Sequence, residues 1–406
     1  MDDVSHYVLH SVQTVVTVGF VTTPRILISG AGIAGNAPGV ALGRRGITAT
    51  VVERAAGPRA GGHTVDLRGH SQHVLRHWGL LEEVIALRVV EERMVAVGRD
   101  GHELWRMPAQ EGGIVADVEI GREDLNSVLE TASAADIHYD EHLVHTTVTA
   151  TGARTQTSRG RQLDADLLVI AEGSRSSLRD HLFPGVRTRY LGGYLAFVAL
   201  PYPGEFGGDM RVYAVGGGVM VAIRPGRVQG MAIIAIRTPR QPELTTDTTA
   251  QRRFVAERIT RVGIADEWHI PSVLDQIAHD PGFHCDELMK VTAPSWSSGR
   301  AVLLGDTAWS GSPLTGLGTA MAIMGAEALA DAIATHPGDL ASALHAYETR
   351  MRRFARWGHA DASSSMLKRW APSTTLQIRI NTLVVQTLTR TPLRHVLTRA
   401  VNPPPW

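Results

Sequence analysis

Cysteines, long apolar runs and an excess of charge of either sign are all scarce in this sequence. Cys285 is the only cysteine among 406 residues, which excludes an internal disulfide framework and any zinc site built from several cysteines. A reducing cytoplasm is the compartment that fits this composition. Forty basic residues balance forty acidic ones, so no summed field argues for nucleic acid or an anionic membrane as a partner. We expect small molecules as partners, and the oligomeric state stays open.

The start of the chain resembles neither a targeting segment nor a membrane span. Its first twenty residues, "MDDVSHYVLHSVQTVVTVGF", contain no Lys or Arg, and Ser, Gln and Thr break the apolar run. Strand-like sequence begins only at "VTTPRILISG". We therefore expect residues 1–23 to be a dispensable leader. The rest of the chain is long and apolar enough for two packed domains or one elaborated domain.

A glycine pattern follows the first apolar run, in "RILISGAGIAG". Gly30, Gly32 and Gly35 form G-x-G-x-x-G, and a second strand, "ITATVVERA", carries Glu53 near its end. In a dinucleotide-binding fold the first glycine makes the tight turn, the second lets a pyrophosphate approach, and the third packs helix on strand. Glu53 would accept hydrogen bonds from a ribose. Pro38 is unusual here because it removes an N–H where the first helix gains turns, so we expect a distorted helix start.

Two further strand-to-turn elements occur later in the chain. "DADLLVIAEGSRSSLRDHL" is typical of a buried strand, a tight turn at Glu172-Gly173 and a helix. "GRAVLLGDTAWSGSPLTGLG" is typical of a strand that ends at Gly305-Asp306 before a glycine-rich helix start. An amphipathic helix is expected from near Arg122 in "VEIGREDLNSVLETA". Three such turns converging on one ligand favour a long ligand.

The three motifs, in this order, resemble those of the single-component flavoprotein monooxygenases of the para-hydroxybenzoate hydroxylase type. The resemblance covers residues 24 to about 360 and includes "GAGIAG" with Glu53, "AEGSRSSLR" and "LLGDTAWSGSPLTGLG". Within the family, "GGHTVDLRGHSQHVLRHWGLLEEV" and "SPLTGLGTAMAIMGAEALA" are most similar to the branch of tetracycline-modifying and polyketide-tailoring monooxygenases. Non-covalent FAD is the cofactor that this resemblance implies, with NADPH or NADH as a transient reductant.

The resemblance also implies a fold. We expect an α/β protein with a Rossmann-like FAD-binding domain of the glutathione reductase type, an antiparallel-sheet substrate domain and C-terminal helices. The FAD-binding domain would comprise residues 24–95, 115–185 and 286–345, and the substrate domain residues 96–114 and 186–285, where strand patterns alternate with Gly and Pro turns. Residues 346–406 would form basic amphipathic helices that pack on the parent domain rather than on a membrane.

Site residues carry over from the family by position. The resemblance implies that Arg122 approaches the FAD phosphates or ribityl chain, that Asp306 contacts the ribityl hydroxyls or pyrophosphate, and that Arg211 leans over the flavin, paired with Asp66. Arg224 is a weaker candidate for that last role. The complete set of implied cofactor-binding residues is Gly30, Gly32, Ala34, Gly35, Glu53, Arg54, Asp66, Arg122, Glu172, Gly173, Asp306, Pro313, Gly316, Leu317 and Gly318, and the implied catalytic residues are Arg211, Pro313 and Gly316.

Three positions depart from the family pattern. Glu172 replaces the Asp of an Asp-Gly motif and is one methylene longer, Trp309 stands where the wider family often has His, and Met324-Gly325 replaces an acidic pair. None of these changes removes the flavin interpretation. His70, His73 and His77 have helical spacing, but no carboxylate or cysteine joins them, so we expect a solvent-facing helix and no metal.

The implied reaction is NAD(P)H-dependent insertion of one oxygen atom from dioxygen into an aromatic or polycyclic, polyketide-like molecule through a flavin C4a-hydroperoxide. His63, Tyr194 and Tyr213 are the candidates to assist deprotonation of a phenol. A flavin-dependent halogenase is an alternative, because "DEWHIP" at 266–271 half-matches a halogenase signature, but Asp266 replaces its first Trp and only two lysines exist. A flavin-binding protein that sequesters a ligand without oxygenating it is the third alternative.

Overall fold

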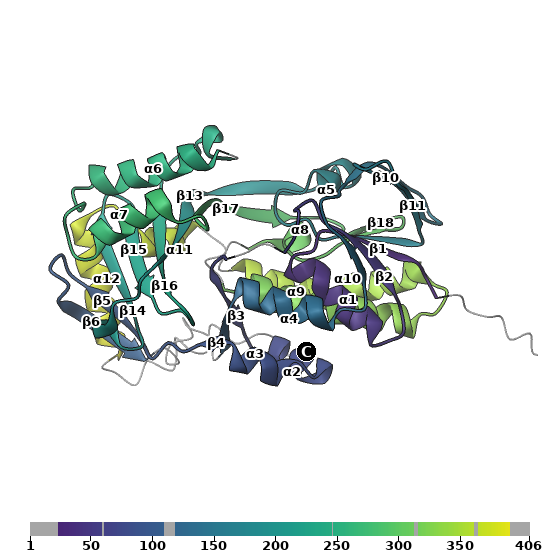
Figure 1. Ribbon diagram of the computed structural model, residues 1–406, viewed down its shortest axis with the longest axis horizontal. Coiled ribbons are helices and arrows are strands. Elements are labelled where there is room, and N and C mark those ends of the chain that lie inside the picture. Colours follow the sequence, from purple (N-terminus) through teal and green to yellow (C-terminus); the bar gives the residue numbers. More distant parts are fainter. Residues whose placement is uncertain are drawn as a thin grey trace, which may run out of the picture.

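The computed structural model describes residues 23–58, 61–108, 118–245, 247–311, 316–360 and 364–389. Two halves lie side by side in Figure 1, one containing the first strand of the chain and the other built on one large sheet. The long strands β13 (Arg187–Leu200) and β17 (His284–Thr292) run between the halves. The expected leader, apart from residue 23, and Pro313 lie outside the described residues.

The first half is built around a six-stranded sheet, ordered β18-β19-β12-β1-β2-β8. The pairs β19–β12, β12–β1, β1–β2 and β2–β8 are parallel. Its central strands are short and almost entirely apolar because a parallel sheet is covered on both faces. The strands are β1 (Ile26–Ser29), β2 (Ala49–Val52), β8 (Asp136–His138), β12 (Leu167–Ile170), β18 (Ser297–Ser298) and β19 (Ala301–Leu303).

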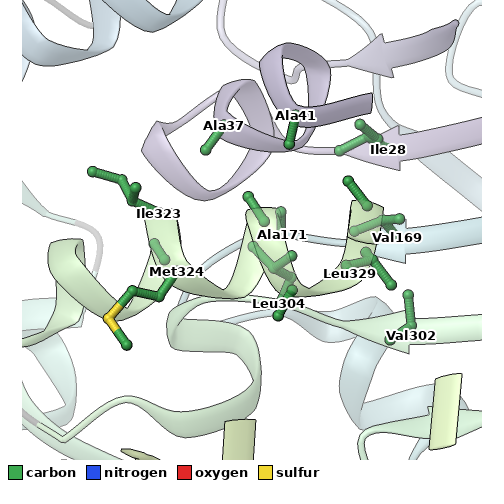
Figure 2. Close-up of a cluster of buried hydrophobic side chains, with 14 of the residues drawn as sticks. Ile28, Ala37, Ala41, Val169, Ala171, Val302, Leu304, Ile323, Met324 and Leu329 are labelled. Carbon is green, nitrogen blue, oxygen red and sulfur yellow. The ribbon is translucent and has the colours of Figure 1, made fainter. Parts of the chain in front are cut away.

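Helices cover one side of this sheet, and a small antiparallel sheet lies on the other side (Figure 1). The helices are α1 (Ile33–Gly43), α4 (Arg122–Ala132), α9 (Gly318–Thr335) and α10 (Leu340–Ala360); the small sheet is β9 (Leu143–Val148), β10 (Ala153–Thr157) and β11 (Gln162–Ala165). Figure 2 shows Ala37 and Ala41 of α1 directed toward α9, whose Ile323 and Leu329 share the same core. Small side chains let the two helices approach closely.

The helix α1 continues from Ile33 to Gly43 with Pro38 inside it and buried. The helix is therefore unbroken at Pro38, and α1 lies against α9 and α4. The proline removes one backbone donor, but the neighbouring helices hold the helical path.

The second half consists of a seven-stranded sheet with helices on both faces. Its order is β17-β13-β16-β15-β14-β5-β6, and every pair except β14–β5 is antiparallel. The remaining strands are β5 (Arg93–Val97), β6 (Glu103–Pro108), β14 (Asp209–Gly216), β15 (Val219–Arg224) and β16 (Gly230–Arg237). The helices are α6 (Thr248–Arg261) and α7 (Ile270–His279) on one side, and α11 (Ser364–Trp370) and α12 (Thr375–Thr389) on the other.

A three-stranded sheet, β3-β7-β4, lies where the two halves meet (Figure 1). It consists of β3 (Thr64–Leu67), β4 (Arg88–Val89) and β7 (Val118–Gly121), next to α2 (His70–Trp78) and α3 (Leu81–Ala86). The short elements α5 (Ser177–Leu182), α8 (Asp306–Trp309), η1 (Gly204–Phe206) and η2 (Pro242–Thr245) complete the described chain. The expected boundaries at 95 and 285 fall inside β5 and β17, and α10 packs on α9 of the first half.

Candidate active site

The turn after β1 leaves space where a dinucleotide would need it. Gly30 has φ +102°, and a Cβ there would lie 2.7 Å from the Ala171 carbonyl oxygen. A Cβ on Gly35 would lie 1.7 Å from the Gly30 carbonyl oxygen. Gly32, by contrast, has nothing within 4 Å of a built Cβ and precedes α1 as its N-cap. Gly30 and Gly35 therefore hold the turn closed, and Gly32 faces open space at a helix N-terminus, where an anion is favoured.

Glu53 follows β2 and points its carboxylate at this turn. Its Oε2 accepts from the backbone N–H of Ala31 at 2.7 Å, and its Oε1 accepts from Ala55 at 2.8 Å. These two bonds fix the carboxylate and leave each oxygen a further lone pair for a ribose hydroxyl. Ala34 lies against Gly305, where a Cβ would be 2.5 Å from the Ala34 Cβ, and Arg54 is exposed.

Arg122 and Asp306 are the two charged residues of the next part of the site, and they interact electrostatically. The backbone N–H of Arg122, at the start of α4, donates to the His63 carbonyl at 3.2 Å. Burial raises the pKa of Asp306, while Arg122 lowers it and Asp286 raises it. Asp306 nevertheless keeps an exposed surface. The Asp306 side chain is thus surrounded by protein and still reached by solvent, and Gly318 lies next to it, with a built Cβ 3.4 Å from Asp306 Oδ1.

Glu172 is held inside the protein at the ends of the parallel strands. Ser29 Oγ donates to its Oε1 and Ser176 Oγ to its Oε2, both at 2.6 Å. The backbone N–H of Gly173 donates to Thr307 Oγ1 at 2.9 Å. The longer side chain at position 172 thus bonds two serines, which ties β1 to the segment that follows β12 and orients the Gly173 turn beside α8.

The turn before α9 lies against β3. Gly316 has φ +61°, and a built Cβ there would lie 2.4 Å from Asp66 Oδ2. Leu317 is buried, and α9 starts at Gly318. Asp66 pairs with Arg68 at 2.7 Å rather than with Arg211. The expected Arg211–Asp66 pair is therefore replaced by a local pair within the "DLR" sequence.

Two faces of the seven-stranded sheet have different surroundings. The outer face, defined by Tyr194, Ala196, Tyr213, Val219, Val221 and Ile223, packs under α6 and α7. The inner face, defined by Leu195, Phe197, Met220, Ala222 and Ala235, faces the other way. Phe197 stacks on His63 from the first half, with ring centroids 4.6 Å apart. Only the inner face therefore meets the residues that surround Arg122 and Asp306.

Arg211 lies on the outer face, because side chains alternate along β14 and Arg211 shares the parity of Tyr213. Its guanidinium stacks over Phe206, 4.5 Å from the ring centroid. Arg224 has the parity of Met220 and Ala222 and therefore belongs to the inner face. The strand arginine on the side of the first half is thus Arg224, the weaker candidate from sequence.

The three candidate proton acceptors separate in the same way. Tyr194 and Tyr213 are buried on the outer face, where burial raises the pKa of both phenols. Tyr213 donates to Glu267, and Trp268 of the "DEWHIP" segment packs edge-on against it at 5.8 Å. Only His63 lies against the inner face. No pattern in the sequence selects it, because helices pack on both faces of the sheet and strand parity does not say which face meets the first half.

Packing accounts for the other two departures from the family pattern, at Trp309 and at Met324-Gly325. Trp309 is 2% exposed and lies against Trp296, with the rings tilted and their centroids 4.6 Å apart. A Cβ at Gly325 would lie 3.0 Å from the Trp309 ring, and Met324 is buried in the core seen in Figure 2. The large indole thus occupies space beside a glycine on α9.

Within the described ranges, no group of three or more His, Cys, Asp or Glu side chains could hold a metal ion. Nor does any helix in these ranges have the length and apolar character needed to cross a membrane. Charged residues with little exposed surface that the sequence did not single out are Arg68, Glu91 and Glu119. Their signal is weak: Glu119 is a single acid between the buried Val118 and Ile120.

The fold and the turn geometry define a dinucleotide-binding architecture with a second, seven-stranded sheet. Residues 23–358 match the family described as FAD binding domain. The chain therefore belongs to that family, and it is a flavin-dependent monooxygenase of the family. One relative, a flavin-dependent monooxygenase from an unknown prokaryotic organism, is 29% identical over 319 residues, which are 77% of this chain and 82% of the relative.

Two solved structures share the fold. Tetracycline destructase Tet(55) has a TM-score of 0.77 and 24% identity, over 95% of this chain and all of that chain (100%). Klebsiella pneumoniae HpxO, complexed with FAD and uric acid, has a TM-score of 0.74 and 19% identity, over 93% of this chain and 96% of that chain. At these identities the likeness concerns the fold alone, and it confirms the α/β architecture with its FAD-binding domain.

Proposed function

We propose that this monooxygenase uses NADPH or NADH to insert one oxygen atom from dioxygen into an aromatic or polycyclic small molecule. The observation that carries the proposal is a continuous chain of contacts between the two halves. Phe197 of the inner face stacks on His63, the His63 carbonyl accepts from the Arg122 backbone, and Arg122 acts electrostatically on Asp306. These contacts connect the apolar inner face to Arg122 and Asp306, the residues that would face a cofactor.

The residues present fit FAD. Gly32 offers open backbone at a helix N-terminus, and Glu53 is fixed beside it for the ribose of the ADP half. Arg122 and Asp306 would face the phosphates and ribityl chain, with Ala34 and Arg54 nearer the ADP end. When bound, FAD would supply the redox chemistry that the resemblance implies, which is acceptance of hydride from NAD(P)H and activation of dioxygen.

Catalytic assistance would come mainly from backbone and position. Gly316, Leu317 and Gly318 lie at the start of the long helix α9, and the family places Pro313 beside them. Backbone N–H groups at a helix N-terminus stabilise developing negative charge. Gly173 and Glu172 would shape the approach of the nicotinamide. The resemblance implies that Arg211 is catalytic. Its guanidinium lies on the outer face, so the proposal for this residue rests on the resemblance alone.

The class of substrate follows from the inner face. The inner face is apolar and aromatic and is buried, with Leu367 and Ala371 of α11 in the same core, and its Phe197, beside His63 of the first half, would suit a flat ring system. Support comes from the relatives of this fold, among them one complexed with uric acid and one named a tetracycline destructase. His63, stacked on Phe197, is placed to accept a proton from a phenol of such a substrate.

The test is aerobic oxidation of NADPH and of NADH by the FAD-loaded protein, with and without a panel of polycyclic phenols. We expect a ligand to stimulate consumption and a product heavier by one oxygen atom. The Tyr213→Phe variant, altered on the outer face, serves as the matched control and keeps the stimulation. Bound FAD with no stimulation by any ligand would favour a flavoprotein that sequesters its ligand instead.

A further inference from the structure

An unusual group of charges is buried where the two halves meet. Arg224 of β15 pairs with Glu91 at 2.9 Å and with Glu119 of β7, and Asp66 pairs with Arg68. The side chains of Arg224, Glu91, Glu119, Asp66 and Arg68 are 8%, 1%, 5%, 13% and 12% exposed. These five residues are called the Arg224 cluster. Burial on this scale makes any uncompensated charge costly.

Strand register joins the two ion pairs into one cluster. Asp66 and Glu119 are direct cross-strand partners of β3 and β7, so their side chains project on the same side of that sheet. Asp66 also acts electrostatically on Glu119, Glu91 and Arg224. Three acids therefore share two arginines. If every group were ionised, the cluster would carry one net negative charge inside the protein.

Within the described ranges, no neighbouring cation pairs with the acids of the cluster to supply the missing positive charge. Glu91 acts on Tyr202, whose pKa burial raises and whose hydroxyl donates to the Asp209 carbonyl. Glu92, Arg93 and Asp209 form a separate group, in which Arg93 pairs with Asp209 at 2.6 Å and with Glu92 at 3.8 Å. Among the described residues this second group contains two acids for one arginine. Two further arginines act on these groups: Arg106 pairs with Glu103, and Arg211 stacks over Phe206 on the outer face.

The cluster also lies directly beside the turn that precedes α9. A Cβ built on Gly316 would lie only 2.4 Å from Asp66 Oδ2, so the carboxylate lies against the backbone of this turn. The resemblance places Gly316 beside the isoalloxazine ring, so the inference that follows rests on the proposed function. Charge at Asp66 and Glu119 would then act on the flavin over a short path through protein, where screening is weak.

We propose that the Arg224 cluster holds one proton at neutral pH and that this proton is linked to the redox state of the flavin, with Glu119 as its carrier and Arg224 as a positioning residue. Above the pH at which oxidised enzyme loses the proton, two-electron reduction by NAD(P)H or dithionite draws one proton from water onto the Glu119 carboxylate. The electrons go to FAD, and the cluster returns to neutrality. Glu119 has a pKa raised to about 9, chiefly by burial, with Arg224 opposing and Glu91 and Asp66 adding to the shift.

The first readout needs no cofactor. Because the native state holds a proton on Glu119 that the unfolded state releases, stability falls as pH rises between 4.5 and about 9. In the FAD-free full chain, the unfolding equilibrium constant of the wild type should rise about tenfold more per pH unit than that of Glu119→Gln. Glu287→Gln is the matched control. Glu287 is also buried, but it is one acid beside two arginines, Arg240 and Arg175. Its replacement should therefore leave the pH dependence of the unfolding constant as in the wild type.

The second readout is the midpoint potential of bound FAD. Above a pH of about 9, the wild-type potential should fall more steeply than that of Glu119→Gln, by about 30 mV per pH unit, the two-electron equivalent of a tenfold change. Glu91→Gln also removes the excess negative charge and should behave like Glu119→Gln, so it replaces that variant if the latter does not fold.

Equal pH slopes of unfolding in wild type and acid variants would overturn the inference, whatever the protein does with FAD. If wild type and Glu119→Gln differ in the pH dependence of unfolding but not in the pH dependence of the FAD midpoint potential, the link to the flavin would be overturned. Failure of the proposed function is recognised separately, by bound FAD whose NAD(P)H consumption no ligand stimulates.

Discussion

The two halves of this protein build their parts of the site from different materials. The first half uses backbone: Gly30 and Gly35 sit where a Cβ would collide with carbonyl oxygens, and Gly32 leaves open space. The second half uses side chains on one face of a sheet, with Phe197 against His63 and Arg224 against two acids. The backbone at Gly30 and Gly35 has no room for a side-chain atom. Side chains on the face of a sheet, by contrast, can be exchanged to change specificity while the fold is kept.

The largest effect that tests this comparison is expected at Gly35. A Cβ at 1.7 Å from the Gly30 carbonyl oxygen must displace backbone, so Gly35→Ala should lose about 3 kcal/mol or more of the free energy of unfolding, measured by urea denaturation. Gly32→Ala is the matched control. It has an ordinary φ of −76° and nothing within 4 Å, so it should fold normally but bind FAD at least about tenfold more weakly, or 1.4 kcal/mol. Normal FAD binding by Gly32→Ala would place the cofactor elsewhere.

The next largest effect is the difference in unfolding free energy between variants of the two strand arginines, Arg224 and Arg211. Arg224→Ala leaves Glu91 and Glu119 buried without their partner, which should cost about 3–5 kcal/mol of unfolding free energy. Arg211→Ala loses only a cation–π contact with Phe206, worth about 1 kcal/mol. Chemical denaturation of both variants measures the difference. A larger loss of stability in Arg211→Ala, or flavin reduction abolished in that variant alone, would show that Arg211 on the outer face is the important strand arginine.

A smaller effect is expected from the aromatic side chains of the sheet. Phe197→Ala removes the inner-face ring that stacks on His63, so the KM for a polycyclic phenol should rise about tenfold, equivalent to 1.4 kcal/mol of binding. Tyr213→Phe changes the outer face and should leave KM unchanged, while the lost hydrogen bond to Glu267 costs about 1 kcal/mol of stability. Equal changes of KM in the two variants would contradict the assignment of faces.

The smallest effect is expected at Glu172. Shortening it in Glu172→Asp should break one of the bonds from Ser29 and Ser176, with a loss of about 1 kcal/mol of unfolding free energy. FAD affinity should change less than threefold, because both oxygens already bond within the protein. Thermal unfolding and flavin fluorescence titration measure the two quantities, and complete loss of FAD binding would show that Glu172 contacts the cofactor.

The difference between the halves also decides what the sequence could predict. The glycine turn and Glu53 are local features, since spacing along the chain fixes their geometry, and the structure has Gly30 and Gly35 in the expected positions. The choice between Arg211 and Arg224 depends on strand parity and on which face meets the first half. The expected Arg211–Asp66 pair was wrong because Asp66 pairs with Arg68. The Arg224 cluster joins residues from four distant segments, and no local pattern contains it.

The most direct test of this account is a crystal structure of the protein with FAD and a stimulating polycyclic phenol bound. The account predicts the isoalloxazine ring beside Gly316, Leu317 and Gly318, with the phenol between the ring and the inner face that carries Phe197. A ring or phenol seated instead against the outer face, beside Arg211 and Tyr213, would contradict it.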